Sequence, residues 1–367
     1  MFFLFIITTF NLLLALPRFA TQNGTNCIAC HINPTGGALR NDYGTNIVSI
    51  DELPMNFWSD EANQDWDGFI NDIIQIGGDI RLQGMQYHKD GEATSAFFPM
   101  QLEIYTFSKL HKNAGIYTEL GILGKNKLSG EFWGLINSLP FKSWLKIGRT
   151  LPNYGLKIDD HSSFIRGGNI NRSLVTDFEK EGLIFTPFIE PPLIIELGSS
   201  IISGLEFTSS LSTTLLQNDS SEGLKNFTSQ LSYYKNHPLL NHNFSISYMK
   251  DGELLMSGFS AGINYKSFIY TYELDQIQNW INDYNSIAIY NEIALEIIQG
   301  LQLIGKYDYF DPSIKHLYGS ISRYSFGLEI YPINIIEFKI QARINSVDID
   351  NFPKSQPEYL IQTHLWF

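Results

Sequence analysis

The sequence predicts an all-β protein: a transmembrane antiparallel β-barrel of about 16 strands, with about 14 and 18 as the limits, and a short α-helical N-terminal segment that plugs its lumen. Three observations lead to this fold. Alternating apolar and polar residues recur in segments of about 10 residues from position 73 to the end of the chain. Charged residues make up only 17% of the chain, although its mean hydropathy is near neutral. Both cysteines of the 367 residues lie before the first expected strand.

Residues 1–20, "MFFLFIITTFNLLLALPRFA", are interpreted as an export signal. The apolar run from Phe2 to Leu16 is interrupted only by three polar residues and is too short to make a stable membrane span. No Lys or Arg precedes it, which departs from the usual signal pattern. Cleavage is expected after Ala15 or Ala20, and the mature chain is expected outside the cytoplasm.

The next segment carries a Cys-x-x-Cys-His motif at Cys27, Cys30 and His31. This spacing is the attachment signature of a c-type haem. On a helical turn the three residues are at i, i+3 and i+4 and share one face. Both thiols can then take a porphyrin vinyl group while the imidazole binds the iron. We therefore expect one covalently bound c-type haem, with His31 as a metal ligand.

Two other roles for the cysteines are less well supported by the sequence. A redox disulfide would be expected beside a βαβ pattern, and none surrounds this motif. A structural zinc site would need further ligands, and the chain has no second cysteine pair.

Residues 21–72 are interpreted as the haem segment and an acidic linker. From Asn41 to Ile80 there is no Lys or Arg. The acidic residues of this stretch are Asp42, Asp51, Glu52, Asp60, Glu61, Asp65, Asp67, Asp72 and Asp79. Its aromatic residues, such as Trp58 and Trp66, argue for packing rather than a solvated linker.

Residues 73–367 are interpreted as the porin-like barrel. The first strand places Ile74, Ile76, Ile80 and Leu82 on one face and Gln75, Asp79, Arg81 and Gln83 on the other. A soluble β-sandwich would also alternate. The last residues of the chain favour the barrel over the sandwich. "PEYLIQTHLWF" sets Tyr359, Ile361, Thr363, Leu365 and Phe367 in one parity, as in the last strand of bacterial outer-membrane barrels.

The longest stretch without alternation runs from Leu151 to Phe178, and long irregular segments are usually functional or disordered. If it folds inward, Asp159, Asp160 and His161 can form a cation site in the pore. If it lies outside, its acids would meet divalent ions of the lipopolysaccharide. The sequence leaves both alternatives open.

The distal haem ligand is also open. Met55, in "ELPMNFW", is the first candidate because it is near in sequence and a Met ligand raises the haem potential. The alternative for Met55 is a core-filling role. Met85, which has lumen parity, and His161 are the other candidates.

The stretch "PRFATQNGTNCIACHINPTGGALRNDYG" resembles the N-terminal signature of fused monohaem cytochrome–porins of the bacterial outer membrane. The shared features are an upstream Arg and Gly, the Cys-x-x-Cys-His motif, a downstream Pro, and an Arg followed by Tyr-Gly. The order of signal, motif and barrel ending in Phe agrees with that family, whose best-known members take electrons from extracellular ferrous iron. The resemblance implies Cys27 and Cys30 as thioether residues and His31 as the proximal ligand.

Two functions follow as hypotheses. The first is electron transfer between an extracellular metal, with Fe(II) expected, and a periplasmic cytochrome or other carrier, so that an Fe(II) oxidase role is open. The haem segment would lie on the periplasmic side or in the lumen. The second is a transport porin for small solutes whose haem is structural or sensory. Outer-membrane lipid is the expected surroundings, and no basic stripe indicates nucleic acid.

Overall fold

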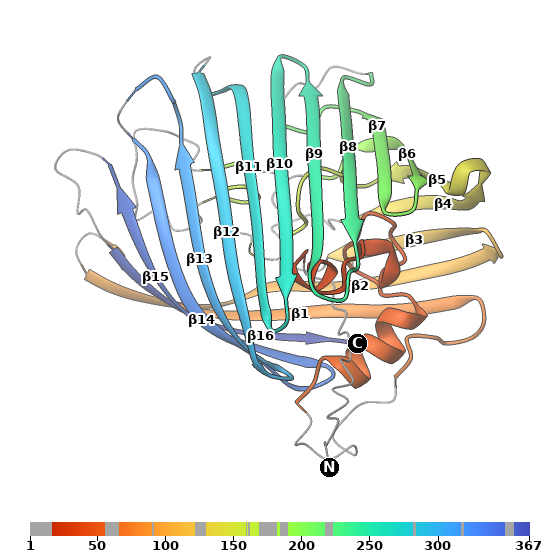
Figure 1. Cartoon of the computed structure of the whole chain (residues 1–367), viewed down its shortest axis with the longest axis horizontal. Helices are drawn as coiled ribbons and strands as arrows, with labels where there is room; N and C mark the ends of the chain where they lie inside the picture. The colour runs from red at the N-terminus through yellow and green to blue at the C-terminus, as the bar shows by residue number, and fades with distance from the viewer. Residues whose placement is uncertain are drawn as a thin grey trace, which may run out of the picture.

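Side chains alternate between outward and inward positions along 16 strands, and antiparallel pairing closes these strands into a barrel (Figure 1). This computed structural model describes residues 17–55, 66–89, 92–121, 130–158, 160, 162–168, 182–183, 190–216, 223–281, 284–316, 319–348 and 356–367. The strands are β1 (Ile74–Lys89), β2 (Glu92–His111), β3 (Ala114–Gly121), β4 (Phe132–Leu139), β5 (Ser143–Arg149), β6 (Leu193–Ile202), β7 (Leu205–Ser212), β8 (Asn226–Lys235), β9 (Asn241–Asp251), β10 (Leu254–Tyr265), β11 (Phe268–Ile281), β12 (Tyr284–Ile298), β13 (Leu301–Asp311), β14 (Ile321–Ile333), β15 (Ile336–Val347) and β16 (Gln356–Trp366). Strand β16 pairs with β1, which closes the barrel and confirms the predicted strand number.

The outer surface is apolar, whereas the interior buries many polar and charged side chains beside apolar clusters such as that of Phe164, Ile277 and Phe310. In β6, Leu193, Ile195 and Leu197 are 62%, 47% and 48% exposed, whereas Glu196 between them is buried. The charged side chain of Arg81 in β1 is likewise buried. A soluble β protein buries its apolar face, so this inverted arrangement excludes the sandwich alternative and matches a barrel in lipid.

The last strand has the predicted parity. Tyr359 and Ile361 point outward and are exposed, while His364 points into the barrel and is buried. Beyond β16, the backbone of Phe367 exchanges two hydrogen bonds of 3.1 Å with Gly78. The terminal residue therefore extends the ladder that seals β16 to β1.

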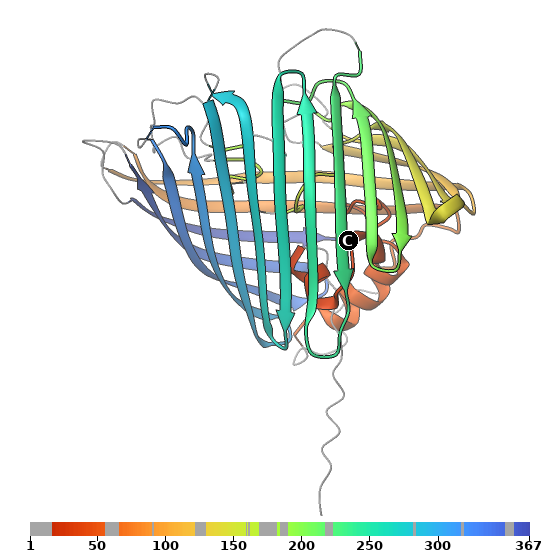
Figure 2. The same ribbon diagram turned by 45° about the horizontal axis from the view of Figure 1, so that its top comes forward.

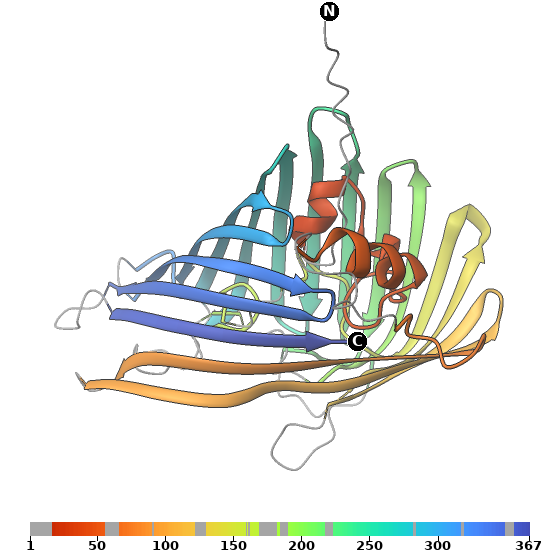
Figure 3. The same cartoon turned by 90° about the horizontal axis from the view of Figure 1, so that it is seen from below.

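The two ends of the barrel differ. At one end the strands are joined by short turns such as 203–204, 266–267 and 334–335, and at the other the connection 150–192 is the longest. The C-terminus lies at the short-turn end (Figures 1 and 2). Residues 17–55, which we call the plug, also lie at this end, within the mouth of the barrel (Figure 3).

The plug is built from short helical pieces. These are α1 (Pro17–Asn23), the 3₁₀ turn η1 (Cys27–Ala29) and the wider helix η2 (Gly44–Glu52). A further 3₁₀ turn, η4 (Pro140–Lys142), joins β4 to β5. None of the described helices is long and apolar enough to cross a membrane.

Amide side chains of the wall bind the backbone of the plug. Asn236, after β8, donates to the Asn23 carbonyl at 2.8 Å, and Gln75 in β1 donates to the Arg40 carbonyl at 2.7 Å. Helix α1 packs against β9, β10 and β11. The short helical N-terminal segment predicted to plug the lumen is therefore confirmed.

Residues 151–168, which we call the inward loop, fold into the lumen in their described part. Tyr154, Phe164 and Arg166 are almost completely buried. The Arg166 guanidinium forms ion pairs with Glu273 and Asp275 on β11. Of the two alternatives for the stretch from Leu151 to Phe178, the inward one holds for the residues described up to 168.

Candidate functional site

The Cys27–His31 stretch forms the predicted helical turn. The Cys27 carbonyl accepts hydrogen bonds from the amides of Cys30 at 3.2 Å and His31 at 3.0 Å. Asn41 holds the turn from the far side, because its Nδ2 donates to the carbonyls of Ile28 and Ala29 at 3.1 and 3.0 Å. The spacing of the motif therefore gives one rigid turn carrying both thiols and the imidazole.

The chain after this turn folds back over Cys27. His31 and Arg40 form an antiparallel bridge, and Gly36 stands at the return with φ +87°. A Cβ on Gly36 would lie 2.8 Å from the Cys27 Sγ. Only glycine allows both this backbone angle and this approach to the thiol.

His31 is buried, and its ring makes only poorly aligned contacts with the backbone of Ala38 and Leu39. Its side chain is 4% exposed, and neither Nδ1 nor Nε2 forms a hydrogen bond of ordinary geometry within the described residues. Burial, reinforced by the Arg40 guanidinium, lowers the pKa of His31 to about 4. The ring is therefore neutral at neutral pH. Buried polar groups normally form well-aligned hydrogen bonds, so this imidazole is able to accept a further ligand.

The two thiols are free in different surroundings. Burial raises the pKa of Cys27, and burial together with Cys27 raises the pKa of Cys30 to about 12. Cys27 faces open space, whereas Cys30 belongs to an apolar cluster with Phe19, Leu53 and Trp366. Neither thiol is a reactive thiolate, which agrees with a role in attachment rather than in nucleophilic catalysis.

A cavity of about 290 Å³ reaches both Cys27 and His31. Its walls come from the plug, the inward loop and the lumen faces of β1–β3 and β14–β16. The lining includes Phe19, Leu53, Tyr105, Tyr117, Leu151, Lys157, Tyr331, His364 and Trp366. A second cavity of about 180 Å³ also reaches Cys27 and is lined mainly by β6–β10. Cys30 lines neither cavity, so of the three residues predicted to share one face only Cys27 and His31 open on the larger cavity. One thiol and a buried imidazole on an aromatic-walled cavity fit a haem held at Cys27 and His31, with Cys30 one turn away in the apolar cluster.

The other predicted ligands are not all brought to this cavity. The Met55 amide donates to the Tyr331 carbonyl at 2.9 Å, and its side chain lies against Gly300 in the turn between β12 and β13. Met55 is not among the residues that line the His31 cavity, and neither is Met85 on β1. The structure thus joins Cys27 and His31 but places the two methionines elsewhere.

The predicted pore cation site is described only in part. Asp159 and His161 lie outside the described residues. Asp160 pairs with Arg343 at 2.9 Å and Lys306 at 3.4 Å. Although burial raises it, these two cations hold the pKa of Asp160 well below its usual range. Within the described ranges no three His, Cys, Asp or Glu side chains cluster closely enough to hold a metal ion.

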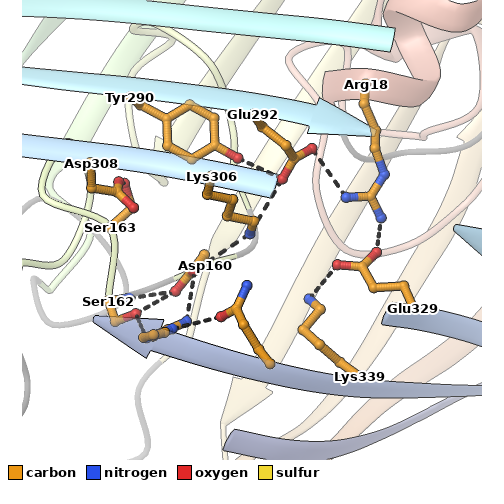
Figure 4. Close-up of polar contacts among 12 residues, drawn as sticks. Arg18, Asp160, Ser162, Ser163, Tyr290, Glu292, Lys306, Asp308, Glu329 and Lys339 are labelled. Carbon is orange, nitrogen blue, oxygen red and sulfur yellow. Dashed lines mark hydrogen bonds and ion pairs between the residues drawn. The ribbon is translucent and has the colours of Figure 1, made fainter. Parts of the chain in front are cut away.

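Asp160 instead belongs to a chain of buried charges that connects the plug, the wall and the inward loop (Figure 4). Arg18 of α1 pairs with Glu292 on β12 at 3.1 Å and with Glu329 on β14. Lys306 on β13 continues from Glu292 at 3.3 Å to Asp160. The network therefore ties both inserted segments to the same region of the wall.

Several residues of the site were missed at the level of sequence. Asn41 carries a local signal, because Asn commonly binds nearby backbone groups in turns. Arg18 carries none, since its partners Glu292 and Glu329 lie 274 and 311 positions away. Lys157 lies in the irregular stretch that begins at Leu151, but its place beside Cys27 depends on two segments that are distant in sequence.

No protein-family model and no curated protein matches this chain. The backbone is similar to solved outer-membrane porins and channels. The anion-selective porin from Comamonas acidovorans has a TM-score of 0.54 at 11% identity, covering 80% of this chain and 99% of that one. The outer-membrane channel DcaP of Acinetobacter baumannii has 0.54 at 9%, covering 82% and 99%. OprB of Pseudomonas putida has 0.55 at 9%, covering 80% and 94%.

At these identities the likeness shows the fold alone. This chain has the porin-like barrel fold of outer-membrane proteins. The similarity concerns the barrel backbone and says nothing about a haem. A haem is indicated by the residues around His31 and by the Cys-x-x-Cys-His motif.

Proposed function

We propose that this protein sits in the bacterial outer membrane and passes electrons between an extracellular metal, most simply Fe(II), and a periplasmic carrier, through one covalent c-type haem. The observation that carries the proposal is the buried His31 on a cavity that also receives Cys27. Among the described residues, neither ring nitrogen of His31 forms a well-aligned hydrogen bond.

The chain's own residues would fix the cofactor. Cys27 and Cys30 would each hold one porphyrin edge through a thioether, and His31 would supply the proximal nitrogen. Asn41 and Gly36 keep these three side chains on one turn. A bound haem supplies reversible one-electron chemistry, which suits metal ions and cytochromes better than hydrolytic substrates.

The two ends of the barrel suit two different partners. In membrane barrels of this kind the short turns face the periplasm and the longer loops face outward. The exposed Asp42 and Asp51 of the plug, and Asp67 and Asp72 before β1, would then face the periplasm. Exposed carboxylates accelerate encounter with a basic carrier, an effect that weakens as salt increases.

Two measurements test the proposal. Denatured protein should retain a haem stain on a gel, and the double variant Cys27→Ala/Cys30→Ala should lose it. Stopped-flow spectroscopy of the detergent-solubilised protein with Fe(II) at neutral pH should then show rapid haem reduction. Haem that is reduced by dithionite but never by Fe(II) would defeat the iron role while leaving the haem in place.

The likeness to porins favours a second function, the passage of small solutes, and the comparisons support it more directly than they support electron transfer. The second cavity is lined on one side by small hydroxyl side chains such as Thr208, Ser245 and Ser260. Solute-dependent conductance in planar bilayers that is the same with oxidised and reduced protein would support the transport function.

A further inference from the structure

We infer that Lys157 is the distal ligand of the haem iron; this inference rests on the covalent haem proposed above. Lys157 comes from the inward loop, which is distant in sequence from the plug. It lines both the His31 cavity and the second cavity beside Cys27. The Lys157 side chain therefore lies where two open spaces meet at the attachment cysteine.

Lys157 differs from Lys146 and Lys306 in forming no ion pair within the described residues. Lys146 pairs with Glu196 at 2.7 Å, and Lys306 pairs with Glu292 at 3.3 Å. For Lys157 there is no ion pair or hydrogen bond within the described residues. Lys157 is half-buried. Burial and the nearby Lys146 ammonium lower its pKa, while Glu131 and Glu196 act in the opposite direction. The neutral amine is the form whose nitrogen can bind iron.

The other possible donors around the cavity are already engaged. His364 contacts Asp79 through Nε2 at 2.9 Å and Glu337 through Nδ1 at 3.2 Å. The Tyr117 hydroxyl donates to Glu119 at 2.8 Å, and the Tyr154 hydroxyl donates to Asp275 at 3.0 Å.

Arginines at the cavity stay protonated and cannot bind a metal. No methionine is among the lining residues. Of the described residues at this cavity, Lys157 is thus the one with an unengaged amine nitrogen. To bind, its ammonium releases one proton to solvent and the Nζ lone pair becomes the ligand.

The test compares ferric spectra and electron paramagnetic resonance of purified, haem-loaded variants. Wild type should be low-spin with two nitrogen ligands. Lys157→Ala should lose the low-spin signal, and Lys157→Arg should lose it equally, because the guanidinium keeps the charge but cannot bind iron. Lys157→His should restore a low-spin signal, and Lys157→Met should raise the reduction potential.

Two controls separate ligation from general damage. Lys112→Met removes an exposed lysine in the turn between β2 and β3, and Met55→Ala removes the methionine suggested by the sequence. Both should keep the wild-type spectrum. Unchanged haem content and heat-dependent gel mobility would show that the Lys157 variants still fold.

The failures are distinguishable. A protein without covalent haem overturns the proposed function itself. Covalent haem that is high-spin in wild type, or that stays low-spin in Lys157→Ala, overturns the Lys157 assignment alone. Loss of the low-spin signal in Met55→Ala, with Lys157→Ala unchanged, would transfer the role to Met55.

Discussion

Two adjacent glycines at the return of the plug have nearly the same backbone but different surroundings. Gly36 and Gly37 have φ of +87° and +94°. A Cβ on Gly36 would meet the Cys27 side chain at 2.8 Å, whereas a Cβ on Gly37 would have nothing within 4 Å. The strain of a non-glycine residue at positive φ, about 1–2 kcal/mol, is therefore common to both positions. The contact with the thiol is specific to Gly36.

This pair gives the first prediction. Gly36→Ala should lower the ratio of haem to protein severalfold, because the methyl group occupies space beside the attachment thiol. Gly37→Ala should fold with a similar backbone cost and keep most of its haem. The absorbance ratio of haem to protein in purified samples measures this. Equal losses in both variants would mean that backbone strain, and not the approach to Cys27, limits attachment.

For single residues, the sequence predicts contacts between neighbours in the chain but not contacts between distant segments. Cys27, Cys30 and His31 share a turn because their contacts lie within four residues, so their spacing alone predicts the geometry. The partners of Arg18 lie 274 and 311 positions away, and no local pattern reports such pairs. Met55 is near His31 in sequence, but the plug places it at the turn beside Gly300.

Helix α1 is held by the buried ion pairs of Arg18, which can be compared with the exposed ion pair of Arg149. Arg18 pairs with Glu292 and Glu329, all three nearly fully buried. Arg149 pairs with Glu190 at 3.1 Å, but their side chains are 42% and 61% exposed. Removing one partner of a buried pair costs about 3–5 kcal/mol, whereas an exposed pair contributes about 0–1 kcal/mol.

We therefore expect Arg18→Ala to loosen the plug and Arg149→Ala to leave it in place. Ionic current through single barrels in planar bilayers should increase for Arg18→Ala and stay at the wild-type level for Arg149→Ala. Because Lys306 and Lys339 still contact the two glutamates, the effect should lie at the lower end of the range. Identical currents in both variants would show that Arg18 does not hold the plug.

The same helix predicts where the mature chain begins. The sequence allows cleavage after Ala15 or Ala20, and helix α1 spans Pro17–Asn23. Arg18 and Phe19 are both 2% exposed, so a cut after Ala20 would remove two buried side chains and an ion-pair hub. The purified protein should therefore begin at Leu16, as judged by N-terminal sequencing and intact mass. A start at Thr21 would mean that the barrel is built without the Arg18 contacts.

For the whole molecule, the barrel was predictable and its interior was not. Alternation along each strand is a local property, and it yields 16 strands with an apolar exterior. What fills the lumen depends on how residues 17–55 and 151–168 meet the wall, through side chains from many strands. Lys157 became a candidate only after folding placed it beside Cys27.

This filled lumen predicts a difference between the two sides of the membrane. The plug lies at the short-turn end. Under the proposed function, a periplasmic carrier would therefore approach it directly, whereas an external donor would have to pass the inward loop and the charged network of Arg18, Lys306 and Asp160. Fe(II) is small enough to enter, but a reduced redox protein is not. In intact cells Fe(II) should reduce the haem and an added redox protein should not. In detergent, where both ends are open, both should reduce it. If the added redox protein reduces the haem in intact cells, the haem lies at the outer surface instead. If Fe(II) reduces the haem in detergent but not in intact cells, the lumen is closed to external metal.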